Sequence, residues 1–230
     1  MITIVAGMHR SGTSLMAGLL HFNRVIMGRH HEFSPPPMKE NPKGFFENRR
    51  FRVINDFILR HNGYQVKSFN TEIPTDPQLP AGALCEMVCL LKEYDLCYEN
   101  WGWKDPRTTL TFGCWFLALK EAGLLNKVRV IVMLRNRDDI RMSMLRRGNK
   151  ENQEGQFVDL SGLYMAAGIK ALWEHNINFR LVPFEALIGE RPEDALSLVE
   201  EMLGVKLTDL SHLDRSIPKS VGSVADEQED

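Results

Sequence analysis

The chain has 230 residues, enough for one well-buried α/β domain and too few for two domains of ordinary size, so we predict a single domain over residues 1–230. Hydrophobic residues make up 43% and charged residues 25% of the chain, as in most globular proteins, and the formal net charge is -2. This balance argues against a protein that coats nucleic acid or an anionic membrane, so any anion site must be local.

The sequence also argues against a membrane-spanning or secreted protein and against a metal-binding protein. No stretch approaches the ~20 consecutive apolar residues that a membrane-spanning helix needs, and the first residues do not read as a secretory signal, so we expect a cytoplasmic protein. Cys85 and Cys89 have helical spacing in an apolar segment, without a neighbouring histidine. We therefore predict free thiols and no metal site.

Strands and helices alternate along the chain. The strands are short apolar runs, predicted at residues 1–6, 101–104, 127–134 and 177–183. The helices have apolar residues at helical spacing, predicted at residues 13–22, 47–63, 81–100, 108–122, 135–148, 157–175 and 192–203. The acidic tail, about residues 222–230, is predicted to be flexible.

This alternation predicts a three-layer α/β sandwich with a mainly parallel sheet and right-handed crossovers. In such sheets ligands bind beyond the carboxyl ends of the strands. The loops that follow residues 1–6, 101–104 and 127–134 should therefore lie together and carry the chemistry.

The first of these loops, "GMHRSGTS", has the features of an anion cradle. Gly7 and Gly12 keep the glycine spacing of the ATPase loop G-x-x-x-x-G-K-[ST], and a helix begins directly afterwards. Thr13 stands where that loop has lysine, and Arg10 lies inside the loop. Backbone amides, hydroxyls and an arginine suit a transferring group that carries less charge than a phosphoryl group, such as a sulfuryl group. The alternative is a solvent-facing turn.

The longer stretch "GMHRSGTSLMAGLL" resembles the 5′-phosphosulfate-binding loop of the sulfotransferases, in the arginine-containing form of bacterial and carbohydrate-type members. The resemblance implies a P-loop NTPase-like sulfotransferase fold, 3′-phosphoadenosine-5′-phosphosulfate (PAPS) as donor, the 3′,5′-bisphosphate PAP as product, and no metal. It also implies that the donor is bound by His9, Arg10, Ser11, Gly12, Thr13 and Ser14.

A second motif, "VRVIVMLRNRDDIRMSMLRR", resembles the 3′-phosphate element of the same family, with Arg135 and Ser143 at the binding positions. Arg135 leaves the strand at its carboxyl end and Ser143 lies on the next helix, so both could reach one phosphate. Alternatively, Arg135 pairs with Asp138 or Asp139, and Ser143 is an ordinary surface residue.

A third motif, "WGWKDPRTTL", resembles the Lys-Asp-Pro-Arg segment of carbohydrate and tyrosyl sulfotransferases. The resemblance implies a catalytic Lys104 near the bridging oxygen of the donor, and Arg107 near the nucleotide or the acceptor. Alternatively, this segment only starts a helix, with Arg107 paired to Asp105.

The resemblance extends to about residue 204. The Arg-Lys-Gly loop of the cytosolic animal enzymes is absent from this sequence, and Lys219 and Ser220 are weak substitutes for it.

Transfer to a hydroxyl needs a general base. Our first candidate is Glu47 in "NPKGFFENRRF", which resembles the glutamate of related bacterial sulfotransferases. A glutamate in a first helical turn is also stabilised there without any catalytic role. His9, His30 and His31 are the other candidate bases; His30, His31 and Lys39 are also candidate acceptor contacts.

Together these motifs predict a PAPS-dependent sulfotransferase, with Arg10, Glu47 and Lys104 as catalytic residues. The predicted partner is a small-molecule or glycan acceptor with a hydroxyl group, and nothing in the sequence indicates an oligomeric state. Two alternatives stay open: a P-loop nucleotide or small-molecule kinase, which would need magnesium and lacks its loop lysine, and a non-catalytic module that binds a bisphosphate nucleotide.

Overall fold

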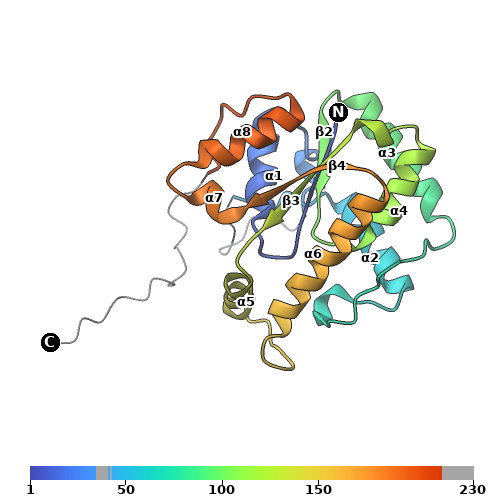
Figure 1. Ribbon diagram of the computed structural model, residues 1–230. Helices are drawn as coiled ribbons and strands as arrows, with labels where there is room; N and C mark the ends of the chain where they lie inside the picture. The colour runs from blue at the N-terminus through green and yellow to red at the C-terminus, as the bar shows by residue number, and fades with distance from the viewer. Residues whose placement is uncertain (35–40, 42, 214–230) are drawn as a thin grey trace.

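Four parallel strands form the central sheet, in the order β2-β1-β3-β4 (Figure 1). They are β1 (Ile2–Ala6), β2 (Trp101–Lys104), β3 (Val128–Leu134) and β4 (Asn178–Pro183). In the register of the sheet, Ile4 of β1 lies between Trp103 of β2 and Val130 of β3. The computed structural model describes residues 1–34, 41 and 43–213, and in this part of the chain the four predicted strands are confirmed.

The seven predicted helices are also confirmed. They are α1 (Thr13–Phe22), α2 (Arg49–His61), α3 (Ala83–Cys97), α4 (Thr108–Glu121), α5 (Arg137–Arg146), α6 (Gln156–Glu174) and α8 (Pro192–Leu203). A short helix that was not predicted, α7 (Phe184–Ile188), follows β4 directly. Short 3-10 helices lie at η1 (His30–Glu32), η2 (Val66–Ser68) and η3 (Leu125–Lys127).

The helices cover both faces of the sheet and make three layers (Figure 1). Side chains alternate across a strand, so Ile4 of β1 packs in a core with α2, α3, α4 and α6, whereas Val5 packs in a core with α1, α7 and α8. Phe51 of α2 stacks on Trp103 of β2 with ring centroids 4.6 Å apart. This contact fixes the start of α2 beside the carboxyl end of β2.

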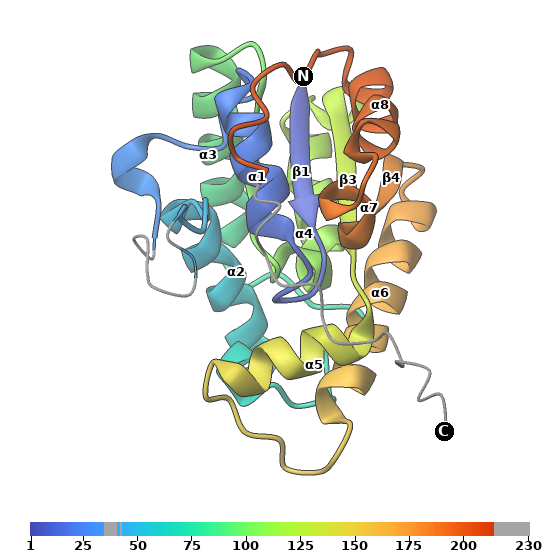
Figure 2. The same cartoon turned by 90° about the vertical axis from the view of Figure 1, so that its left-hand side faces the viewer.

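The carboxyl ends of β2, β1 and β3 are neighbours in the sheet, which confirms that the three predicted loops meet at one edge. In Figure 2, β1 points toward this edge and α5 lies across it. None of the helices described is long and apolar enough to cross a membrane. The predicted acidic tail, Lys39, Lys219 and Ser220 lie outside the described residues.

Candidate functional site

The loop between β1 and α1 is a tight backbone cradle that requires its two glycines. Gly7 and Gly12 have φ values of +134° and +94°. A Cβ atom would lie 2.7 Å from the Met133 carbonyl oxygen at Gly7, and 2.3 Å from the Phe184 ring at Gly12. The loop turns where the Ser11 amide and hydroxyl both donate to the Met8 carbonyl, at 3.2 and 2.7 Å. Ser11 therefore shapes the loop through its side chain.

The N-terminus of α1 faces a cavity of about 220 Å³. The first helical hydrogen bond runs from the Met16 amide to the Gly12 carbonyl at 3.2 Å, so the amides of Thr13, Ser14 and Leu15 have no partner inside the helix. All three residues line this first cavity. Open amides at a helix N-terminus favour an anion there.

The structure brings the first and second sequence motifs together. The Arg135 Nη1 donates to the Arg10 carbonyl at 3.0 Å, across 125 positions of sequence. The Arg10 Nε donates to the Ser143 Oγ at 2.8 Å. Ser143 is buried on α5, so it is not the surface residue that the alternative interpretation required.

Arg135 lies against an aromatic ring rather than a carboxylate. Its guanidinium is 4.5 Å from the centroid of the Phe184 ring, and its buried Nε has no hydrogen-bond partner among the described residues. Within the same residues, no Asp or Glu oxygen lies within 4.0 Å of this guanidinium, so the alternative pairing with Asp138 or Asp139 is wrong. Burial lowers the pKa of Arg135 below its ordinary value.

Lys104 and Glu47 form a buried ion pair beside the loop. Lys104 is only 2% exposed, and its Nζ lies 2.8 Å from Glu47 Oε1, 3.2 Å from Ser14 Oγ and 3.3 Å from the Phe45 carbonyl. Glu47 pairs with Lys104 as an isolated parallel bridge next to β2. Asn48 caps α2, so the interpretation of Glu47 as a first-turn glutamate is wrong: Glu47 precedes the cap. Glu47 is held in position by its backbone bridge to Lys104 at the end of β2 and by the ion pair with the Lys104 side chain.

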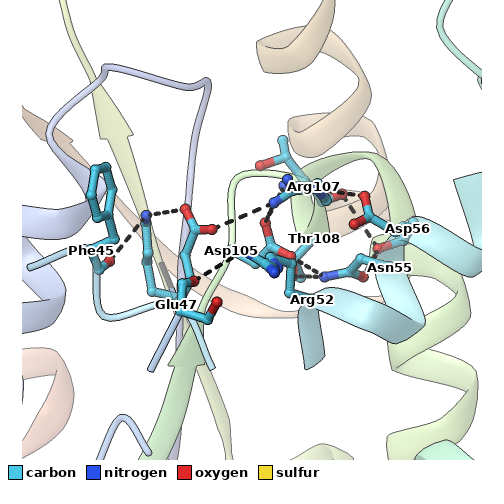
Figure 3. Close-up of polar contacts among 12 residues, drawn as sticks. Phe45, Glu47, Arg52, Asn55, Asp56, Asp105, Arg107 and Thr108 are labelled. Carbon is cyan, nitrogen blue, oxygen red and sulfur yellow. Dashed lines mark hydrogen bonds and ion pairs between the residues drawn. The ribbon is translucent and has the colours of Figure 1, made fainter. Parts of the chain in front are cut away.

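Arg107 lies between Glu47 and α2 (Figure 3). Its guanidinium contacts Asp56 at 2.8 Å, Asp105 at 2.9 Å and Glu47 Oε2 at 3.6 Å. The pairing of Arg107 with Asp105, which the sequence offered as an alternative, is therefore present. Arg107 nevertheless also contacts Glu47, the candidate base. Three carboxylates compensate this one guanidinium.

Asp105 is the buried anchor of this network. Burial alone would raise the pKa of its carboxyl, but Arg107 and a 2.9 Å hydrogen bond from the Asn55 side chain hold that pKa below its ordinary value. Asn55 also accepts from Thr111 and Trp115, at 2.6 and 2.7 Å. The network keeps Arg107 fixed before any ligand arrives.

A second cavity, of about 420 Å³, adjoins the first. The two share His9, Phe45, Glu47 and Arg147 as lining residues. Lys104 lines only the first cavity, and Arg107 lines only the second. Glu47 therefore lies at the boundary between the two cavities.

His9 lies at the same boundary in a neutral form. Its ring meets Phe69 and Tyr164 edge to face, at 5.7 and 6.3 Å between centroids, and its buried Nε2 has no partner among the described residues. Burial, followed by the nearby Arg107 charge, lowers the pKa of His9 to about 3. His9 is therefore uncharged near neutral pH.

Other predicted residues lie away from the cavities. His30 and His31 are exposed in η1 and line neither cavity, and their roles stay predictions. No group of His, Cys, Asp or Glu that could hold a metal is found among residues 1–34, 41 and 43–213.

Sequence reasoning missed several residues of the site, among them Phe184 and Arg147. Phe184 follows β4 at its carboxyl end, so the rule that located the other loops applied to it as well. Arg147 lies at the end of α5, and nothing in its local sequence separates it from the adjacent Arg146.

The fold and site thus define a parallel α/β protein with a glycine-containing loop between β1 and α1 at the carboxyl edge of the sheet. Among solved structures, the chain is similar to the sulfotransferase domain of the olefin synthase from Synechococcus PCC 7002, with a TM-score of 0.51 and 16% identity, over 98% of this chain and 80% of that one. This likeness shows a shared fold and confirms the predicted fold class.

A second similar structure is sulfotransferase STF1 from Mycobacterium tuberculosis H37Rv, with a TM-score of 0.44 and 14% identity, over 90% of this chain and 68% of that one. No protein-family model and no curated protein matches the chain.

Proposed function

We propose that this protein is a sulfotransferase that moves a sulfuryl group from PAPS to a hydroxyl acceptor, as a single cytoplasmic domain. The observation that carries the proposal is the contact of Arg135 with Arg10, and of Arg10 with Ser143. It joins the phosphate-type loop to a second cationic position beyond the sheet edge. A donor with phosphates at both its 5′ and 3′ positions would need two such positions, whereas ATP would need only the first.

The residues present fit this donor. The loop amides at Thr13, Ser14 and Leu15 would bind the 5′-phosphosulfate, since the glycines at 7 and 12 let the backbone come close. Arg135, whose buried Nε has no partner among the described residues, would bind the 3′-phosphate together with Ser143. PAPS would supply an activated sulfuryl group to this site.

Lys104 and Glu47 would carry the proton and charge changes of the transfer. The acceptor oxygen forms a bond to sulfur as the bond from sulfur to the bridging oxygen breaks, and the hydroxyl proton goes to Glu47. The negative charge left on the bridging oxygen is stabilised by Lys104, whose Nζ already contacts Ser14 of the loop. The products are the sulfated acceptor and PAP.

Calorimetric titration with PAP, ATP and GTP, with and without magnesium, tests this proposal. We expect PAP to bind without magnesium and at least ~10-fold more tightly than ATP, because a charge-assisted contact to the extra phosphate contributes roughly 1.5–3 kcal/mol. Magnesium-dependent preference for ATP would support the kinase alternative instead. A transfer assay with sulfur-labelled PAPS and pooled hydroxyl acceptors then separates catalysis from binding alone.

A further inference from the structure

The second cavity is lined by more positive charge than the transfer reaction needs. Its charged lining residues are one carboxylate, Glu47, and four cations: Arg52, Lys67, Arg107 and Arg147. Arg107 is compensated by Asp56, Asp105 and Glu47, as described above. The compensation of the other three cations, Arg52, Lys67 and Arg147, therefore needs a separate explanation.

These three cations have no carboxylate partner in the described part of the chain, where no Asp or Glu oxygen lies within 4.0 Å of Arg52, Lys67 or Arg147. The Arg52 side chain donates to the Ser34 carbonyl at 3.2 Å, and the Arg147 guanidinium lies 5.4 Å from the centroid of the Phe45 ring. They come from separate segments, α2, η2 and the end of α5, and converge on one cavity. A protein with a net charge of -2 has no general excess of cations that would account for this.

Apart from His9 and Asn149, the rest of the cavity wall is apolar and aromatic. Phe45, Val66, Phe69 and Met144 lie among the cations, and Phe69 is held edge to face against Phe157 at 5.9 Å. A wall of this kind binds the apolar face of a ring, while the guanidinium and ammonium groups bind acidic oxygens. The volume, about 420 Å³, fits a small molecule or the terminal unit of a larger one.

We infer that the acceptor is a ring-containing hydroxyl compound with an anionic group of its own, which Arg147, Arg52 and Lys67 bind while the hydroxyl lies at Glu47. The inference rests on the proposed sulfotransferase function for the reaction, whereas binding of the acid can be measured without the donor. The cations assigned to the donor, Arg10, Arg135 and Lys104, do not line this second cavity.

Matched acceptor pairs test the inference. The purified full chain is assayed with sulfur-labelled PAPS and a hydroxyaryl carboxylic acid or its methyl ester, and then with a uronic acid or the corresponding neutral sugar. A hydroxyaryl phosphate shows whether the anion must be a carboxylate. We expect kcat/KM to favour the anionic member of each pair by ~10-fold or more, and the ratio to fall as salt is raised. Equal values within each pair would overturn the inference.

Variants that remove one positive charge test whether the preference for the anionic acceptor arises at the second cavity. Arg147→Gln should lower the acid-to-ester ratio ~10-fold, chiefly through the KM of the acid. Arg60→Gln removes the same charge from an exposed position on α2 that lines neither cavity, and should leave the ratio unchanged. Thermal unfolding confirms that both variants fold. An equal loss of preference in both variants would refute the assignment to this cavity.

Direct titration separates failure of the inference from failure of the proposed function. The hydroxyaryl acid and its ester are titrated into the protein with and without PAP. If PAP does not bind but the acid binds more tightly than the ester, and Arg147→Gln removes the difference, the anion-binding cavity stands and the proposed reaction fails. If PAP binds and acid and ester bind alike, the inference fails and the reaction stands.

Discussion

The two sides of the candidate site, one beside β2 and the other beside β3, differ in how the protein compensates their cations. On the side of β2, Lys104 and Arg107 are held by carboxylates, with the closest contacts at 2.8 Å from each. On the side of β3, Arg135 contacts a backbone carbonyl and the ring of Phe184, and no described carboxylate pairs with it. Among the described residues, the cations on the β2 side form ion pairs, whereas Arg135 on the β3 side has no carboxylate within 4.0 Å.

This difference separates a framework from a binding site. A buried ion pair with further hydrogen bonds, such as Lys104 with Glu47, fixes its side chains before a ligand binds, as the proposed catalytic roles of these two residues require. A half-buried guanidinium such as that of Arg135, which has no described carboxylate within 4.0 Å, gains a charge-assisted contact when an anion binds. Substitutions on the β2 side should therefore change the rate of transfer, and those on the β3 side should change nucleotide affinity.

Glu47→Gln should give the largest effect. The amide keeps an acceptor for Lys104 but cannot take a proton, so we expect the single-turnover transfer rate to fall by ~10²–10⁴ and PAP affinity to change by less than ~3-fold. Glu93→Gln, which removes a surface carboxylate that pairs with Arg50 on α2, is the matched control and should leave the rate intact. A parallel loss of rate, PAP affinity and thermal stability would show that Glu47 is only structural.

Arg135→Ala should give the next largest effect, on binding. Loss of one charged contact should weaken PAP by ~10- to 100-fold, whereas adenosine 5′-monophosphate, which lacks the 3′-phosphate, should lose less than ~3-fold. Arg129→Ala removes an arginine from the other end of β3 and should change neither affinity. Equal losses for both nucleotides would contradict a 3′-phosphate contact and erase the proposed difference between the two sides.

Local sequence was sufficient to place most of the fold. Both α1 and α8 have the predicted bounds, because Gly12 precedes the first, and Pro192 and Gly204 bracket the second. The helix α7 was missed since its five residues are too few for a helical period to show. The start of α2 was misplaced, although Asn48 is a favoured N-cap residue and its side chain accepts from the Arg50 amide.

From the sequence, only the residues that follow the carboxyl ends of the strands could be predicted to lie together in the site. The rule that strand ends share one edge brought Arg10, Lys104 and Arg135 together, and each of them lines the first cavity. The convergence of Arg52, Lys67 and Arg147 on the second cavity depends on how α2, η2 and α5 pack, and no local pattern encodes that. Likewise, Asn55 and Asp105 meet across 50 positions of sequence. The functional roles of these residues stay predictions.

His9 affects stability rather than rate or affinity, and it tests the boundary between the two cavities. Its pKa is lowered to about 3 by burial first and by the Arg107 charge next, against an ordinary value of 6.5. Between these values the unfolded chain binds a proton that the folded chain does not, so stability falls as the pH drops below about 6.5. The slope from His9 approaches about 1.4 kcal/mol per pH unit.

His9→Gln isolates this contribution. Burial also lowers the pKa values of His21 and His212, but both residues remain in the variant, so their effects cancel in the comparison. Urea unfolding at several pH values should show wild type losing stability relative to the variant as the pH falls, whereas His61→Gln, at an exposed end of α2, should follow wild type.

Parallel curves for wild type and His9→Gln would mean that His9 is already charged in the folded protein. A charged His9 would add a cation to the two cavities that Glu47 also lines, where Lys104 and Arg107 already pair with this carboxylate, and would weaken Glu47 as the base.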